Sequence, residues 1–293
     1  MSTQTPGSNS LLRIGVVQCA LGRASRSENV DEVARLIRLA AELGAQIILP
    51  PELFEGPYFC QQELPEHFDL AHPMDAHPTV ERMQALAAEL GVVIPVSVFE
   101  QDKQSYYNTV AMVDADGRVL GTYRKSHIPD GPGYEEKFFF RPGNTGMKVW
   151  DTRHGRVGVG ICWDQWFPEC ARVMALAGAE LLFYPTAIGS EPEEPELDSR
   201  DPWRRVMIGH AVANAMPVAA ANRVGLEGQQ RFFGSSFICD QRGELHADMD
   251  RDQVGVAMAS FDRDELRRYR ANWGFFRDRR PEARWRTVEE SAR

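Results

Sequence analysis

The chain has 293 residues, 43% of them apolar, and a formal net charge of -9 from 33 basic and 42 acidic side chains. A chain of this length and composition can bury a large hydrophobic core. The acidic excess argues against a nucleic-acid-binding protein, which gathers Lys and Arg on one face, and suits a protein that handles small or cationic ligands.

The chain begins with MSTQTPGSNS, which is polar and lacks the apolar run of a secretion signal, and no later stretch is apolar enough to cross a membrane. We expect residues 1–10 to form a disordered tail. The five cysteines show no CxxC or Cys/His spacing typical of zinc sites. We therefore expect free thiols and a cytoplasmic location. We also expect no metal, no cofactor, and no membrane or nucleic-acid partner.

The first half of the chain predicts alternating strands and helices. Segment 11–19, LLRIGVVQC, is rich in branched apolar residues and predicts a buried strand, and residues 28–43 carry apolar side chains at helical spacing. The next predicted elements are a strand at 45–50, a helix at 80–90, a strand at 92–100 and a hairpin over 108–125 that turns at Asp116-Gly117.

The second half repeats this alternation without repeating the sequence. Its predicted elements are strands at 156–162, 180–185 and 217–222, helices at 168–177 and 203–215, and a hairpin over 233–246. Two long segments, 126–145 and 189–202, are predicted as loops, and the second is strongly acidic. Strands that alternate with helices and are interrupted by hairpins predict an α/β fold with mixed sheets. No linker divides the chain, so one domain is expected.

The stretch VGVGICWDQWFPEC places Cys162 where an apolar strand stops. A cysteine in such a run is most often a core residue, because a free thiol packs as a small hydrophobic side chain. The polar and aromatic WDQWFPE that follows contains a proline suited to the first turn of a helix, so Cys162 is expected at a strand-to-helix turn. A helix N-terminus favours a thiolate, which makes Cys162 a candidate nucleophile, whereas Cys170 is a core candidate.

A nucleophilic thiol needs a base, and histidine is the usual partner. His127 and His210 are available, but neither stands in a papain-like context. Glu52, in IILPPELFEG, directly follows a buried strand, where an unpaired carboxylate is costly, and Lys125 closes the predicted hairpin. Each of these charges alone is more often solvated. Glu52, Lys125 and Cys162 nevertheless form a set, because each stands at a strand end.

Three segments, ILPPELFEG, YRKSHIPDGPGYEEKFFFRPG and GVGICWDQWFPE, resemble the signature regions of the nitrilase superfamily of carbon–nitrogen hydrolases. The resemblance implies that Glu52 is the general base, Lys125 the cation that stabilises the oxyanion, and Cys162 the nucleophile. The family's further active-site glutamate falls in EEKFFFRPG and is placed at Glu136 rather than Glu135.

The resemblance also implies a fold and an organisation of the chain. Members of the superfamily form a four-layer αββα sandwich of two mixed β-sheets and usually assemble as dimers or larger oligomers. We therefore expect one carbon–nitrogen hydrolase domain over residues 11–285 and a homo-oligomer. The arginine-rich C-terminal tail, residues 274–293, is expected to contact a partner subunit.

An amide carbon is a poor electrophile, so its attack by a thiol needs a base, a cation near the developing oxygen charge and a proton for the departing amine. The three residues supply these functions without a metal. The backbone N–H of Trp163, just after the nucleophile, is expected as a second oxyanion donor. Glu136 is expected to accept hydrogen bonds from Lys125 or from the substrate, the alternative being a surface charge beside Lys137.

Within the superfamily, the segments ELFEGPYFCQ, FYPTAIGSEP and DSRDPWRRVM are most similar to amidases that act on N-carbamoylputrescine. That similarity implies hydrolysis of a ureido group to putrescine, CO2 and ammonia, a step of polyamine biosynthesis. The distal ammonium of such a substrate needs a carboxylate partner. Glu191 is the leading candidate for this contact, followed by Asp130 and Asp198. The aromatic side chains expected to line the pocket are Tyr58, Phe59, Tyr134, Trp163 and Trp166.

Other functions stay open at this point. A β-ureidopropionase or an N-carbamoyl amino acid amidohydrolase would need an arginine for the substrate carboxylate, and Arg204, Arg205 or Arg223 are the candidates. A transferase would share the covalent intermediate and differ only in its product. A catalytically silent binding protein of the same fold is the non-enzyme alternative.

Overall fold

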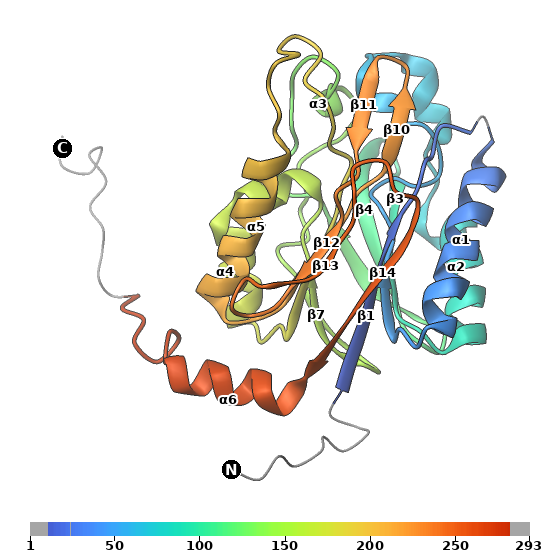
Figure 1. Ribbon diagram of the computed structural model, residues 1–293. Helices are drawn as coiled ribbons and strands as arrows, with labels where there is room; N and C mark the ends of the chain where they lie inside the picture. The colour runs from blue at the N-terminus through green and yellow to red at the C-terminus, as the bar shows by residue number, and fades with distance from the viewer. Residues whose placement is uncertain (1–10, 24, 282–293) are drawn as a thin grey trace.

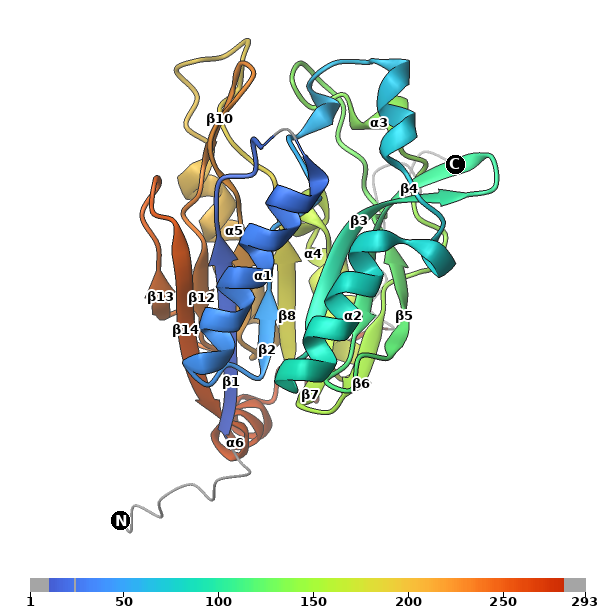
Figure 2. The same cartoon turned by 90° about the vertical axis from the view of Figure 1, so that its right-hand side faces the viewer.

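Two β-sheets lie face to face at the centre of the molecule, and helices cover the outer face of each (Figure 1). The computed structural model describes residues 11–23 and 25–281. Figure 2, turned by 90°, shows helices α1 and α2 in front of one sheet. The result is a sandwich of four layers, helix, sheet, sheet and helix.

The first sheet consists of two three-stranded parts, ordered β14-β1-β2 and β3-β4-β5. Backbone hydrogen bonds join them: the Ile48 N–H donates to Val93 O and the Val93 N–H to Gln46 O, both at 2.9 Å. Strands β1 and β2 pair in parallel, and the bridge between Ile47 and Val93 is parallel as well, whereas β1–β14, β3–β4 and β4–β5 are antiparallel. The strands are β1 (Leu11–Gln18), β2 (Ile47–Leu49), β3 (Ile94–Asp102), β4 (Ser105–Val113), β5 (Val119–Arg124) and β14 (Gly255–Asp262).

The second sheet has the order β13-β12-β9-β8-β7-β6. Strand β8 pairs in parallel with β7 and with β9, and the remaining pairs are antiparallel, so this sheet is mixed as well. Its strands are β6 (Val149–Thr152), β7 (Gly155–Val159), β8 (Leu181–Pro185), β9 (Val218–Ala221), β12 (Phe237–Cys239) and β13 (Leu245–Asp248). A separate hairpin consists of β10 (Val224–Glu227) and β11 (Gln230–Phe233).

Helices α1 (Arg26–Glu42) and α2 (Pro78–Leu90) cover the first sheet, and α4 (Pro168–Leu176) and α5 (Arg200–Asn214) cover the second. Helix α6 (Arg263–Trp273) runs beneath the sandwich at the C-terminal end of the described chain (Figure 1). The shorter helices are α3 (Glu136–Phe139) and the 3-10 turns η1 (Phe59–Gln61), η2 (Pro65–Leu70), η3 (Met74–Ala76) and η4 (Cys162–Trp166).

Alternating side chains of the strands fill three hydrophobic layers, because successive residues of a strand point to opposite faces. In β8, Leu181 and Phe183 pack between the sheets, whereas Leu182 and Tyr184 pack against α4 and α5. This explains why the central strands are apolar at nearly every position: both of their faces are buried.

The α/β class and the four-layer sandwich of mixed sheets are confirmed. The prediction for the strand 156–162 was wrong at its end: β7 stops at Val159, and Cys162 begins a 3-10 turn. Helix α5 begins at Arg200, inside the segment predicted as a loop. Strands β6, β10, β11 and β14 and helix α6 were not predicted.

The predicted tail 1–10 lies outside the described residues, and the single-domain boundaries 11–285 stay a prediction. Of the C-terminal tail, residues 274–281 are described. There Phe276 packs on its own chain, with the guanidinium of Arg172 at 5.2 Å from its ring centroid. Contact of the tail with a partner subunit remains a prediction.

Candidate active site

Glu52, Lys125 and Glu136 meet at the edge of the sandwich where β2 and β5 end. The Nζ atom of Lys125 lies 2.9 Å from Glu52 Oε1 and 2.6 Å from Glu136 Oε2. All three side chains are buried. Glu52 and Lys125 follow strands that are far apart in the sequence, and Glu136 opens helix α3, 11 residues after Lys125. The fold therefore brings together the charges that the sequence had singled out.

The two carboxylate oxygens of Glu52 differ in their partners. Oε1 accepts hydrogen bonds from Asn108 Nδ2 at 2.7 Å and from Lys125. Oε2 is buried and has no hydrogen-bond partner among the described residues. A buried carboxylate oxygen without a donor is costly, so it is a natural acceptor for a proton or for a substrate N–H.

The ammonium of Lys125 is held between two carboxylates. Burial lowers the pKa of Lys125, but the negative charges of Glu136 and Glu52 outweigh burial and the pKa lies well above its usual value. Burial raises the pKa of Glu136, against the opposing effect of Lys125. Glu136 Oε1 also accepts a hydrogen bond from the Tyr58 hydroxyl at 2.7 Å. Lys125 therefore remains charged and cannot rotate away from the site.

Cys162 opens the 3-10 turn η4 with φ of 41°, in the left-handed region that non-glycine residues rarely adopt. Its side chain is 5% exposed, and Sγ lies 3.8 Å from the Ala187 carbonyl oxygen. Burial, followed by the charges of Glu52 and Glu136, raises the pKa of Cys162 well above its usual value, although the charge of Lys125 opposes this. Burial therefore favours the thiol at this position, whereas a helix N-terminus favours the thiolate.

The carboxylate of Asp164 fixes this turn. It accepts hydrogen bonds from the Ile161 N–H at 2.9 Å and from the His127 N–H at 3.0 Å, and it also binds the His127 ring and the Tyr123 hydroxyl, each at 2.7 Å. Asp164 thereby ties the cysteine-bearing turn to the segment that follows Lys125. One role for His127 is thus to hold Asp164.

A cavity of about 250 Å³ opens onto Cys162. Of the sequence candidates, it is lined by Cys162, Glu136, Trp163, Asp130, Tyr134 and Glu191. The other lining residues are Pro129, Gly131, Pro132, Ala187 and Ile188. Among these lining residues the charged side chains are all carboxylates. Trp163 lines the cavity, and its backbone N–H makes no hydrogen bond within the described part of the chain, so this N–H is available as a donor.

Four other pocket candidates do not line the cavity, and neither Glu52 nor Lys125 is among its lining residues. Tyr58 stands behind Glu136, as its hydrogen bond shows. Trp166 packs against the layer of α4 and α5, with its ring centroid 6.2 Å from that of Trp163. Asp198 is at the surface, where it pairs with Arg251 at 2.5 Å. Phe59 likewise belongs to an aromatic cluster outside the cavity.

The arginines considered for a carboxylate-bearing substrate also lie elsewhere. Arg204 pairs with Asp248 at 2.7 Å, and Arg205 is exposed on the outer face of α5. Arg223 is fully buried and pairs with Glu227 at 3.0 Å.

Sequence reasoning missed the actual task of Arg223. Its guanidinium donates to the carbonyl oxygens of Glu52 at 2.8 Å, Leu53 at 2.9 Å and Gly56 at 3.1 Å. Arg223 therefore holds the loop that carries Glu52. Because the hairpin β10–β11 was not predicted, no signal in the sequence placed Arg223 beneath that loop.

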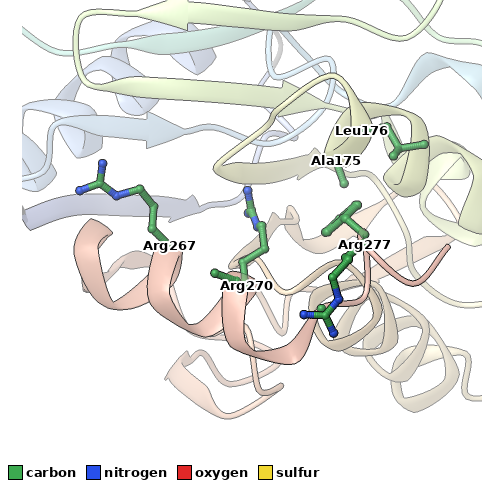
Figure 3. Close-up of a pocket in the computed structure, with 8 residues that line it drawn as sticks. Ala175, Leu176, Arg267, Arg270 and Arg277 are labelled. Carbon is green, nitrogen blue, oxygen red and sulfur yellow. The ribbon is translucent and has the colours of Figure 1, made fainter.

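A second hollow, of about 480 Å³, lies between the end of α4 and helix α6. Arg267, Arg270 and Arg277 border it but point in different directions (Figure 3). Arg267 pairs with Asp264 and Arg277 with Asp278. None of the residues gathered around Cys162 reaches this hollow, so it is not part of the candidate active site.

Comparison with known proteins assigns the family. The carbon-nitrogen hydrolase family model matches residues 13–271. The chain belongs to the carbon-nitrogen hydrolase family. As a member of that family it is an enzyme that acts on carbon–nitrogen bonds of amides.

Similar proteins are found in plants and bacteria. The chain is 56% identical to the N-carbamoylputrescine amidase of Arabidopsis thaliana over 87% of this chain and 88% of the plant protein. It is 51% identical to the citrullinase of Francisella tularensis over 92% of this chain and 96% of the bacterial protein. The crystal structure of a carbon-nitrogen hydrolase from Helicobacter pylori superposes with a TM-score of 0.86 at 36% identity, covering 94% of this chain and 97% of that one.

No helix within residues 11–23 and 25–281 has the length and apolar character needed to traverse a bilayer. In the same ranges no three or more His, Cys, Asp or Glu side chains are grouped so that they could hold a metal ion.

Proposed function

We propose that the protein hydrolyses the ureido group of N-carbamoylputrescine to putrescine, CO2 and ammonia, with Cys162 as nucleophile. One observation carries the proposal: the charged residues that line the cavity above Cys162 are all carboxylates, and the Lys125 ammonium lies beside Glu52, the proposed base for Cys162. Such a cavity suits a substrate that has an amide-like end and a cationic end. The identity of 56% to a plant N-carbamoylputrescine amidase supports the same substrate.

The first half-reaction begins with a thiol rather than a thiolate. The unpartnered Oε2 of Glu52 takes the Cys162 proton as sulfur bonds to the ureido carbon. Lys125 and the Trp163 N–H stabilise the oxygen on which negative charge develops. Glu52 then gives its proton to the NH2 group, which leaves as ammonia. A carbamoyl thioester that carries the aminobutyl chain remains on Cys162.

The second half-reaction uses the same groups in reverse. Glu52, again ionised, takes a proton from a water molecule that attacks the thioester carbon. The carbon–sulfur bond breaks and the sulfur regains its proton. The carbamic acid that is released decomposes to CO2 and putrescine. Glu136 touches Lys125 throughout and keeps its ammonium directed at the reacting oxygen.

The distal ammonium of the substrate is assigned to Glu191. This side chain lines the cavity, and burial raises its pKa, as expected of a carboxylate that lacks a cationic partner. Asp130 also lines the cavity but pairs with Lys137 at 3.6 Å, so it is the weaker candidate. Asp198 is not proposed, because it pairs with Arg251 at the surface.

Citrulline is the second candidate substrate, because a citrullinase is 51% identical to this chain. Citrulline carries an α-carboxylate next to its α-ammonium. Within the described residues no Arg, Lys or His lines the cavity to pair with that carboxylate. The same absence disfavours carbamoyl-β-alanine and other carbamoyl amino acids. We therefore expect the enzyme to prefer substrates whose distal end is cationic and lacks a carboxylate, with N-carbamoylputrescine as the best of them.

Ammonia release measured with N-carbamoylputrescine, citrulline and carbamoyl-β-alanine tests the substrate. The highest kcat/KM is expected for N-carbamoylputrescine, and Cys162→Ala is the inactive control. A higher kcat/KM for citrulline would show that citrulline, and not N-carbamoylputrescine, is the preferred substrate. If none of the three compounds released ammonia, the protein would be the catalytically silent binding protein. A transfer product in place of CO2 and putrescine, with ammonia still released, would indicate the transferase.

Mass spectrometry of the wild-type enzyme, quenched with acid during turnover, tests the covalent step and the order of departure. Loss of ammonia first adds about 114 Da to the Cys162 peptide, whereas loss of putrescine first adds about 43 Da. An adduct on any other cysteine would refute the assignment of the nucleophile.

A further inference from the structure

Two loops form the walls of the cavity above Cys162. One contains residues 129–136, with Tyr134, and the other contains residues 186–191, with Glu191. The loops approach each other closely at Gly133, where φ is +80° and a Cβ atom would stand 2.9 Å from Pro192. Their relative position therefore sets the shape of the cavity and the place of the Glu191 carboxylate.

Gln230, the first residue of β11, joins the two loops from behind. Its side chain is 1% exposed and does not line the cavity. The Nε2 atom donates to the Tyr134 hydroxyl at 2.5 Å and also to the Ser190 carbonyl oxygen. The same hydroxyl accepts a hydrogen bond from the Gly189 N–H at 2.9 Å. One amide group thus contacts both walls at once.

The backbone next to Gln230 strengthens this connection. The Ser190 N–H donates to Arg231 O at 2.8 Å, and the Arg231 N–H donates to Ser190 Oγ at 3.1 Å. Strand β11 therefore holds residue 190 from both the backbone and the side chain of Gln230. The next residue along the chain is Glu191, which has no such attachment to β11.

We propose that Gln230 is a positioning residue that sets substrate specificity: it fixes Ser190 and Tyr134 so that the Glu191 carboxylate meets the distal ammonium of the substrate. This inference rests on the proposed function, since it concerns the cationic end of N-carbamoylputrescine. Gln230 acts through Glu191 and does not touch the reacting atoms. Its effect is expected on the binding of a cationic substrate and not on cleavage of the ureido group.

The test compares N-carbamoylputrescine with butylurea, which has the same ureido group and chain length but no ammonium. In Gln230→Leu, KM for N-carbamoylputrescine is expected to rise about 10-fold, with kcat within about twofold of the wild type, because the change removes a buried donor from two acceptors. The kcat/KM for butylurea is expected to stay within about twofold. Gln229→Leu is the matched control, since Gln229 is the exposed neighbour on the same hairpin, and no change is expected with either substrate.

A double-mutant cycle tests whether Gln230 acts through Glu191. Glu191→Gln alone should raise KM for N-carbamoylputrescine, and Gln230→Leu added to it should raise KM no further. Independent, multiplying effects would overturn the proposal, as would an equal loss with butylurea or no loss in Gln230→Leu. If Gln230→Leu fails to fold, Gln230→Met keeps a similar side-chain length while removing the donor, and the same criteria apply.

The failure of this inference differs from the failure of the proposed function. A wild-type enzyme that does not prefer N-carbamoylputrescine to butylurea refutes the cationic subsite and with it both proposals. A wild-type preference that survives unchanged in the Gln230 variants refutes the role of Gln230 alone.

Discussion

Replacing Arg223 by methionine should destabilise the protein and misplace Glu52, the proposed catalytic base. Arg223 is fully buried, and its guanidinium pairs with Glu227 and donates to the carbonyl oxygens of Glu52, Leu53 and Gly56. Methionine fills a similar volume but donates no hydrogen bond. The variant therefore leaves a buried carboxylate without its cation and three carbonyl groups without their donor.

The expected cost follows from those contacts. Removing one partner of a buried ion pair costs about 3 to 5 kcal/mol, because the other charge stays buried and uncompensated. A change of that size lowers the melting temperature by roughly 10 °C in a chain of this length. Since the lost carbonyl contacts include that of Glu52, kcat should fall as well.

Urea denaturation and ammonia-release assays of the wild type, the single variant Arg223→Met and a double variant test this prediction. The double variant Arg223→Met/Glu227→Gln should recover about half of the lost stability, because the unpaired charge is gone, and little of the lost kcat. The Tyr58 N–H donates to Glu227 at 2.6 Å, and glutamine keeps an acceptor for it. A loss of less than about 1 kcal/mol in the single variant, or a double variant no more stable than the single one, would refute the reasoning.

Two further predictions concern pH. Burial raises the pKa of Glu136, so the folded protein binds more protons than the unfolded chain above pH 4.5, and stability falls as pH rises toward about 7. Between pH 4.5 and about 7, the unfolding free energy of Glu136→Gln should fall less than that of the wild type. Urea titrations at several pH values measure this, and an equal fall in both proteins would contradict it. Burial lowers the pKa of His77 to about 4, so stability is lost as pH falls from 6.5 to that value. The loss at full protonation is about 3 kcal/mol, and His77→Gln should reduce it, as melting temperatures measured from pH 7 to pH 4 would show.

The strand ends were the part of the site that sequence patterns located. Glu52 and Cys162 each follow a run of apolar residues, and Lys125 closes a predicted hairpin. Hydrophobic periodicity shows where the first two runs end, because both faces of β2 and the end of β7 are buried. The ionisation of Cys162 was not accessible in this way, since it depends on burial and on two carboxylates from distant segments.

Partners that come from distant strands were also missed. Asn108 lies in the middle of β4 and reads as an ordinary strand residue, yet it holds the Oε1 atom of Glu52. Gln230 gave no signal because its strand is short and polar at that point. Asp198 was considered for its charge alone, and only the fold shows that Arg251 neutralises it. Charge and spacing along one chain do not determine which opposite charge is near in space.

The raised pKa of Cys162 affects how readily its sulfur is oxidised. Peroxide and other electrophiles react with the anionic form of a cysteine, and that form is rare here until a carbonyl carbon is in place to accept the sulfur. Burial, together with the charges of Glu52 and Glu136, therefore makes the resting Cys162 side chain less reactive toward peroxide than an ordinary exposed cysteine.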